Sequence, residues 1–166
     1  INETDKALRK LVDYFDKEDE PVVLVFFGDH NPWLGDENKG YKMLNIDMGL
    51  EDEESFKNYY TTPYVFWAND KAKEVIGNDF KKEGEDVSPN FLMTELFEVL
   101  NYPGDEYMQY SKDLKNNYFT VNNDMFFRQA DGNYTRQLEG EDFKVWREFN
   151  SVQYYHGRHF KYDYLK

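Results

Sequence analysis

The feature that most constrains the fold is an apolar run at residues 22–27, which Pro21 precedes and Gly28-Asp29-His30 follows. An uninterrupted run of this length, rich in β-branched and aromatic residues, is typical of a strand buried on both faces. Such strands belong to open α/β sheets, in which ligands collect beyond the carboxyl ends of the strands. The run therefore predicts a buried strand, parallel to its neighbour, with Asp29 and His30 at its carboxyl end.

Asp29 and His30 place a carboxylate and an imidazole beside a flexible glycine, and these two groups can serve as metal ligands. Carboxylates suit manganese or magnesium, whereas one imidazole moves the preference toward manganese or zinc. The alternative is a Gly-Asp turn with a nearby surface histidine. Spacing alone leaves both interpretations open, because an adjacent Asp-His pair is a weak pattern.

The neighbouring segments set the expected fold class. Before Pro21, apolar residues recur at the helical spacing of Leu8, Leu11, Val12 and Phe15. A second strand is expected at Tyr64–Ala68, where Pro63 introduces another apolar run. A helix that leads directly into a buried strand favours an α/β fold, with a mixed or mainly parallel sheet covered by helices. We expect this α/β part to span residues 1–114.

The second half of the sequence predicts further helices and a small β-hairpin. Ser88-Pro89 is a helix start, and the apolar stripe that follows continues to Leu100. A short helix is expected at 108–114. The hairpin region is expected at 115–166, with strands at 118–121, 125–129 and 134–138, a turn at Asp131-Gly132 and a C-terminal helix at 141–155.

The polar segments are expected to lie at the surface. Residues 35–54 predict a long loop with one short helix, and residues 71–83 predict a charged surface segment around Gly77. The acidic cluster at 51–54 lacks the alternating spacing of a calcium loop. It therefore predicts the solvated start of a helix.

Composition narrows the classes of partner. The 166 residues carry a formal net charge of −13, which argues against nucleic-acid backbones and anionic lipid surfaces as the main partners. Hydrophobic residues make up 40 % of the chain, enough for a core, and cysteine is absent, which excludes disulfides and thiolate metal sites. No run approaches the ~18 apolar residues that a transmembrane helix requires.

Four segments together resemble a known family. In chain order they are FFGDHNPWLG (26–35), YYTTPYVFWAND (59–70), SPNFLMTELFEVLNYPG (88–104) and WREFNSVQYYHGRHF (146–160). This series is similar to the C-terminal part of the lipoteichoic acid synthase-like sulfatases, a branch of the alkaline phosphatase superfamily. The family's catalytic threonine and an acidic metal ligand lie upstream of the matching region. The resemblance therefore implies that residues 1–166 are a C-terminal fragment of one catalytic domain, inactive alone and without a catalytic residue of its own.

The resemblance also implies a chemistry. In that family the Asp and His of the motif help to bind a divalent metal, usually Mn²⁺, so Asp29 and His30 are the expected metal ligands here. The parent would be an extracytoplasmic, membrane-anchored enzyme of lipoteichoic acid or cell-wall synthesis, which moves glycerol phosphate from a phospholipid headgroup onto a growing polymer. The alternatives are a sulfate-ester hydrolase, a phosphoethanolamine transferase, or a non-catalytic surface domain that keeps the fold.

Other candidate residues carry less weight. Asn31 and Trp33 share the loop of the expected metal ligands and are candidates for binding the glycerol or lipid headgroup, although Trp33 could instead anchor the loop by packing. Thr61 and Thr62 precede a strand and have no adjacent base, so they are not expected to be nucleophiles. The pair His156 and His159 has a spacing that can chelate a metal on a helix, but Gly157 and the aromatic surroundings favour a packed or exposed C-terminal role.

Two partners are expected for a fragment of this kind. One is the missing upstream half of the catalytic domain, and the other is a second copy of the chain. An aromatic content of 19 % predicts exposed apolar patches, and a strand edge left without its neighbour promotes association.

Overall fold

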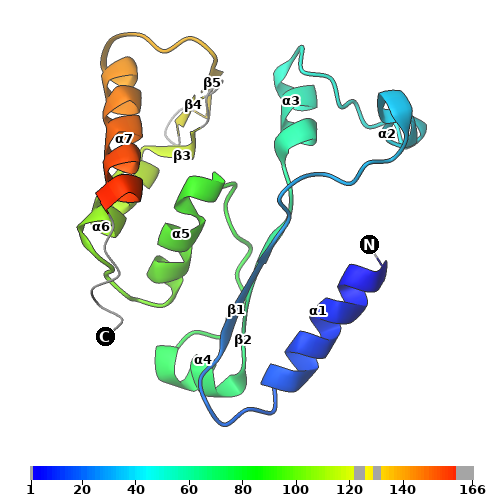
Figure 1. Cartoon of the computed structure of the whole chain (residues 1–166), viewed down its shortest axis with the longest axis vertical. Helices are drawn as coiled ribbons and strands as arrows, with labels where there is room; N and C mark the ends of the chain where they lie inside the picture. The colour runs from blue at the N-terminus through cyan, green and yellow to red at the C-terminus, as the bar shows by residue number, and fades with distance from the viewer. Residues whose placement is uncertain (1, 122–125, 129–131, 160–166) are drawn as a thin grey trace. The chain divides into compact units, whose positions relative to one another are not determined.

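The structure, a computed structural model, describes residues 2–121, 126–128 and 132–159. It is a mixed α/β arrangement that divides into two compact units, residues 1–82 and 83–166 (Figure 1). Asp131 of the expected hairpin turn and part of the expected strand at 125–129 lie outside the described residues. In the described ranges, no helix combines the length and the apolarity that a membrane span requires.

Unit 1 is built on two strands, β1 (Val23–Phe27) and β2 (Tyr64–Ala68), as the apolar runs predict. They pair antiparallel, with Val23 opposite Ala68 and Phe27 opposite Tyr64. The expectation of a parallel neighbour for this strand is therefore wrong. The expectation of burial on both faces is also wrong, because β1 is half-buried and Phe27 is 51 % exposed.

The connection between the strands explains their direction. Between β1 and β2 the chain forms a 3₁₀ turn η1 (Asp36–Asn38) and helices α2 (Lys39–Met43) and α3 (Glu53–Tyr60). These elements stay beyond the end of β1 at which the chain leaves it (Figure 1). The chain therefore re-enters the sheet from that same end, which an antiparallel pair allows. A parallel pair would need a crossover back to the start of β1.

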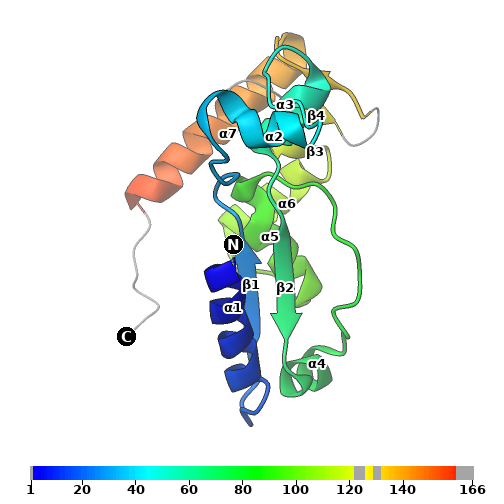
Figure 2. The ribbon, with the colours of Figure 1, turned by 90° about the vertical axis from the view of Figure 1, so that its right-hand side faces the viewer.

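Helices α1 (Asn2–Phe15) and α4 (Asp70–Ile76) complete unit 1. Helix α1 runs alongside the two strands (Figure 2), and the helical pattern before Pro21 correctly predicts it. The charged residues at 71–83 predict only a surface segment, whereas the structure forms helix α4 there. Its N-cap is Asn69, whose side chain accepts from Ala72 N, and it ends at Gly77 in the left-handed region.

The acidic cluster at 51–54 is the helix start that its spacing predicts. Asp52 caps α3, with its Oδ1 accepting from Ser55 N at 2.8 Å, and the Ser55 side chain completes a capping box. Glu53 and Glu54 lie in the first turn, where negative charge favours the positive end of the helix dipole.

Unit 2 contains the expected helices and strands in the expected order. They are the 3₁₀ turn η2 (Pro89–Phe91), α5 (Leu92–Val99), α6 (Glu106–Lys115), β3 (Tyr118–Val121), β4 (Phe126–Arg128), β5 (Tyr134–Thr135) and α7 (Gly140–His159). The strands form an antiparallel sheet of order β3-β4-β5. The core consists of Phe91, Leu114, Tyr118 and Phe149. Helices α5 and α6 therefore lie in the same compact unit as the three-stranded sheet and α7.

Candidate functional site

The candidate site begins where β1 ends, at Gly28. Its N–H donates to Pro63 O at 3.0 Å, and its carbonyl accepts a hydrogen bond from Thr62 Oγ1 at 2.7 Å. A Cβ atom added to Gly28 would lie 3.0 Å from the Cβ of Thr62. Glycine is therefore favoured here by the close approach of the two chains, and the backbone that leads to Asp29 is held on both sides.

Asp29 and His30 both project into solvent from this point. Their side chains are 83 % and 76 % exposed, and His30 Nε2 lies 3.7 Å from Asp29 Oδ1. The other ring nitrogen, Nδ1, lies 2.9 Å from the backbone oxygen of Asn31. In the tautomer with its proton on Nδ1, the ring donates to that oxygen and keeps the Nε2 lone pair on the side of Asp29. The structure thus brings the two predicted ligands together on one loop.

Hydrogen bonds from the Asn31 side chain connect this loop to the end of α3. Its Nδ2 lies within hydrogen-bonding distance of three backbone oxygens, at 3.0 Å from Asn58, 2.8 Å from Tyr59 and 3.3 Å from Thr61. The last carbonyls of a helix have no partner within the helix, and Asn31 supplies one from a distant part of the chain. No spacing in the sequence signals this role. The amide nitrogen of Asn31 therefore positions the loop.

The following residues continue the loop toward α2. Tyr41 donates its hydroxyl hydrogen to Pro32 O at 2.7 Å, and Gly40 N donates to Leu34 O at 2.8 Å. Trp33 lies in the chain between the two residues that accept these hydrogen bonds, and it is 78 % exposed. Its ring therefore does not anchor the loop by packing within unit 1, and its expected contact with a headgroup stays a prediction.

The remaining candidates have other contacts. The hydroxyl of Thr62 is engaged with Gly28, which fits the expectation that it is not a nucleophile. His156 stacks on Tyr107 with ring centroids 4.0 Å apart, and His159 stacks on Tyr155 at 4.4 Å. Across the ranges that the structure describes, no group of three or more His, Cys, Asp or Glu residues is arranged to hold a metal ion. Asp29 and His30 alone are thus an incomplete ligand set.

Comparison with known proteins places the chain in a family. Residues 1–102 match the sulfatase family, which covers more than half of the chain and includes the whole loop from Gly28 to Trp33. This chain belongs to the sulfatase family. Members of the family typically use metal ions.

One curated relative adds a biochemical context. A Rhizobium meliloti (strain 1021) protein named for cyclic beta-1,2-glucan modification is 26 % identical over 135 residues. The aligned region is 78 % of this chain but only 19 % of the relative, so the chain spans about a fifth of that protein's length. No solved structure matches the chain.

Proposed function

We propose that this chain is the C-terminal part of the catalytic domain of a metal-dependent sulfatase-family transferase. Asp29 and His30 supply two ligands of its divalent metal. The observation that carries the proposal is the loop at the end of β1, where both side chains are exposed and their donor atoms lie 3.7 Å apart. The match of residues 1–102 to the sulfatase family supports the same conclusion.

The Asp29 carboxylate and the His30 imidazole supply part of the ligand set that a divalent ion needs. Asp29 Oδ1 and His30 Nε2 are 3.7 Å apart on exposed side chains, so both would be able to hold one divalent ion. The backbone oxygen of Asn31 beside His30 Nδ1 is the kind of partner that orients metal-binding imidazoles. Carboxylate with one imidazole suits Mn²⁺. The other ligands and the nucleophile belong, in this proposal, to the upstream part of the catalytic domain.

The proposed reaction is transfer of glycerol phosphate from phosphatidylglycerol to a saccharide hydroxyl, at the extracytoplasmic face of the membrane. The phosphoester bond to diacylglycerol breaks and one to the saccharide oxygen forms. The proton of the saccharide hydroxyl passes to the oxygen of the released diacylglycerol. A bound divalent ion stabilises negative charge on a transferring phosphoryl group and activates an oxygen nucleophile. This chain contributes the orientation of two ligands, through the bonds of Thr62 and Asn31 that fix the loop. The glucan in the name of the Rhizobium relative supports a saccharide acceptor.

Binding of Mn²⁺ to the 166-residue chain tests the ligand assignment. Paramagnetic broadening of NMR signals should begin at residues 28–31 and should require millimolar Mn²⁺, because two protein ligands are few for this ion. Asp29→Asn should remove the broadening, whereas Asp36→Asn, in the exposed η1 turn, should leave it unchanged. Broadening centred on the acidic residues 51–54 and insensitive to Asp29→Asn would contradict the assignment.

Activity of the longer parent enzyme tests the reaction. With Asp29→Asn, the parent should lose transfer of labelled glycerol phosphate from phosphatidylglycerol to a glucan, while its circular dichroism spectrum stays unchanged. Release of sulfate from an aryl sulfate, with no transfer of glycerol phosphate, would overturn the substrate but keep the metal site. The 166-residue chain alone should show neither activity.

A further inference from the structure

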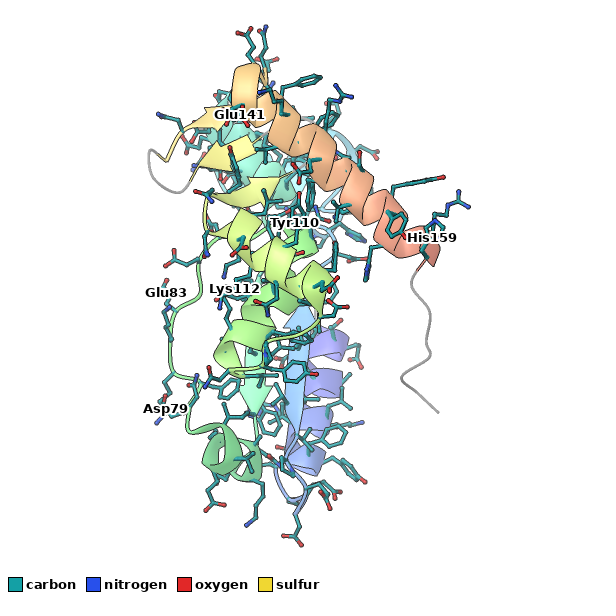
Figure 3. All side chains as sticks on the ribbon, turned by 90° about the vertical axis from the view of Figure 1, so that its left-hand side faces the viewer. Asp79, Glu83, Tyr110, Lys112, Glu141 and His159 are labelled. Carbon is teal, nitrogen blue, oxygen red and sulfur yellow. The ribbon has the colours of Figure 1, made fainter. Side chains whose placement is uncertain are left out.

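A pocket in unit 2 lies outside the residues that match the sulfatase family. It has a volume of about 320 Å³ and is formed by α6, the start of β3 and α7. Its lining includes Tyr110 and Asp113 from α6 and Val145 and Glu148 from α7. Figure 3 shows Tyr110 on the side of α6 that faces α7. Because these residues follow residue 102, family membership assigns them no role.

The charged residues that line the pocket are both acidic. Asp113 and Glu148 contribute carboxylates, and no Lys, Arg or His belongs to the lining as the described residues define it. The nearby lysines are engaged elsewhere: Lys112 with Glu98, Lys115 with Glu95 and Glu98, and Lys144 with Glu141. An anionic ligand would therefore meet two like charges without a compensating cation.

The walls of the pocket are largely aromatic and apolar. Tyr118 is 8 % exposed, and its hydroxyl donates to Asp142 Oδ1 at 2.7 Å, which fixes its ring. Burial, followed by the charge of Glu148, raises the pKa of Tyr110 above its ordinary value. The phenol thus stays neutral at physiological pH. Leu114 and Val145 add aliphatic side chains to the lining.

We propose that this pocket binds a small organic cation of the alkylammonium or quaternary ammonium class. Tyrosine rings attract such cations through their electron-rich faces, and more strongly where water is partly excluded. Two carboxylates at the same pocket add a Coulomb attraction that a neutral ligand does not receive. The apolar residues accommodate the methyl or methylene groups of the cation.

Calorimetry and NMR on the 166-residue chain test this proposal with a matched pair of ligands. Choline is the probe, and 3,3-dimethylbutan-1-ol, which has the same shape without the charge, is its control. Choline should shift the signals of Tyr110 and Tyr118 and should bind at least fivefold more tightly than the neutral alcohol. Glu148→Gln should weaken choline binding about fivefold, the effect of one charge contact near water-like dielectric.

Variants outside the pocket separate a local effect from the overall negative charge. Glu139→Gln removes the same charge from an exposed residue just before α7, whose carboxylate bonds to the neutral side chain of Gln137, and should leave choline affinity unchanged. Tyr110→Leu should weaken choline binding more than alcohol binding, with an unchanged circular dichroism spectrum. Equal affinities for both ligands, tighter binding of a neutral glucan oligosaccharide, equal losses in Glu139→Gln and Glu148→Gln, or no binding at millimolar choline would each overturn the proposal.

Discussion

The hydroxyl of Thr62 donates a hydrogen bond to the backbone oxygen of Gly28 at 2.7 Å. This bond joins the segment just before β2 to the residue just after β1, and thus closes the end of the sheet from which Asp29 projects. The Cβ of Thr62 also limits what can replace Gly28, because an added Cβ would lie 3.0 Å from it. One residue therefore supplies both the bond and the steric limit that position the candidate metal loop.

Thr62→Val should destabilise unit 1 by about 1 kcal/mol, because valine keeps the shape and removes the donor. Thr62→Ser keeps the hydroxyl and should cost less. Gly28→Ala should cost about 1–3 kcal/mol, since the new methyl group meets the rigid β-branched side chain of Thr62. Urea unfolding followed by tryptophan fluorescence measures all three. A Thr62→Val protein as stable as the parent would show that the bond does not hold the loop.

Asn69→Ala should be among the most destabilising single changes in unit 1. The Asn69 side chain is almost fully buried, and its Oδ1 accepts from Val22 N at 3.0 Å and Ala72 N at 2.9 Å. Its Nδ2 donates to backbone oxygens of the turn that follows α1, including Glu20 O at 2.9 Å. Because alanine leaves several of these groups without a partner, we expect a loss of about 3 kcal/mol.

Two further variants show whether the loss of stability comes from the hydrogen bonds of Asn69. Asn69→Asp keeps the acceptor but places a carboxylate against backbone oxygens, so it should also destabilise unit 1 by more than 1 kcal/mol. Asn116→Ala, at an exposed position, should change stability by less than about 0.5 kcal/mol. Thermal unfolding ranks the three. Similar effects for Asn69→Ala and Asn116→Ala would contradict the role of Asn69 in joining α1, β1 and α4.

Lys115 should make the stability of unit 2 fall at high pH. Burial of the ammonium lowers its pKa, but hydrogen bonds and charge from Glu95 and Glu98 outweigh burial, so the net pKa is raised above its usual 10.5. A raised pKa in the folded state means that the pair stabilises the fold fully below pH ~10.5. That contribution is then lost as pH rises through the folded pKa. Urea unfolding between pH 8 and 11.5 measures the decline.

Lys115→Met provides the comparison for this pH dependence. The methionine chain fills similar space but leaves Glu95 and Glu98 without their common cation, so unit 2 should be less stable at pH 8. The variant should then lose less stability than the wild type between pH 10 and 11.5. A parallel decline in both proteins would assign the pH dependence to other groups.

The local patterns of the sequence determined most of the secondary structure. The apolar runs at 22–27 and 64–68 predict β1 and β2, and Ser88-Pro89 predicts the start of the η2–α5 helical segment. Asp52 and the acidic residues after it predict the start of α3. These signals can be read from the sequence because capping, helix-dipole and burial preferences act between residues that are neighbours in the chain. Helix α4 was missed because its short apolar face is hidden among charged residues.

Tertiary structure alone decided the direction in which the strands pair and the long-range hydrogen bonds that join the elements. The run at 22–27 is compatible with either strand direction, and β1 is antiparallel because the chain between the strands stays at one end of the sheet. Asn31 bonds to backbone oxygens at least 27 positions away, and Asn69, besides capping α4, bonds to backbone groups up to 54 positions away. No local pattern reveals these distant partners. The sequence placed Asp29 beside His30. The tertiary structure decided how the backbone on either side of this pair is fixed. The bonds that fix it come from distant segments, because they depend on proximity in space and not in the sequence.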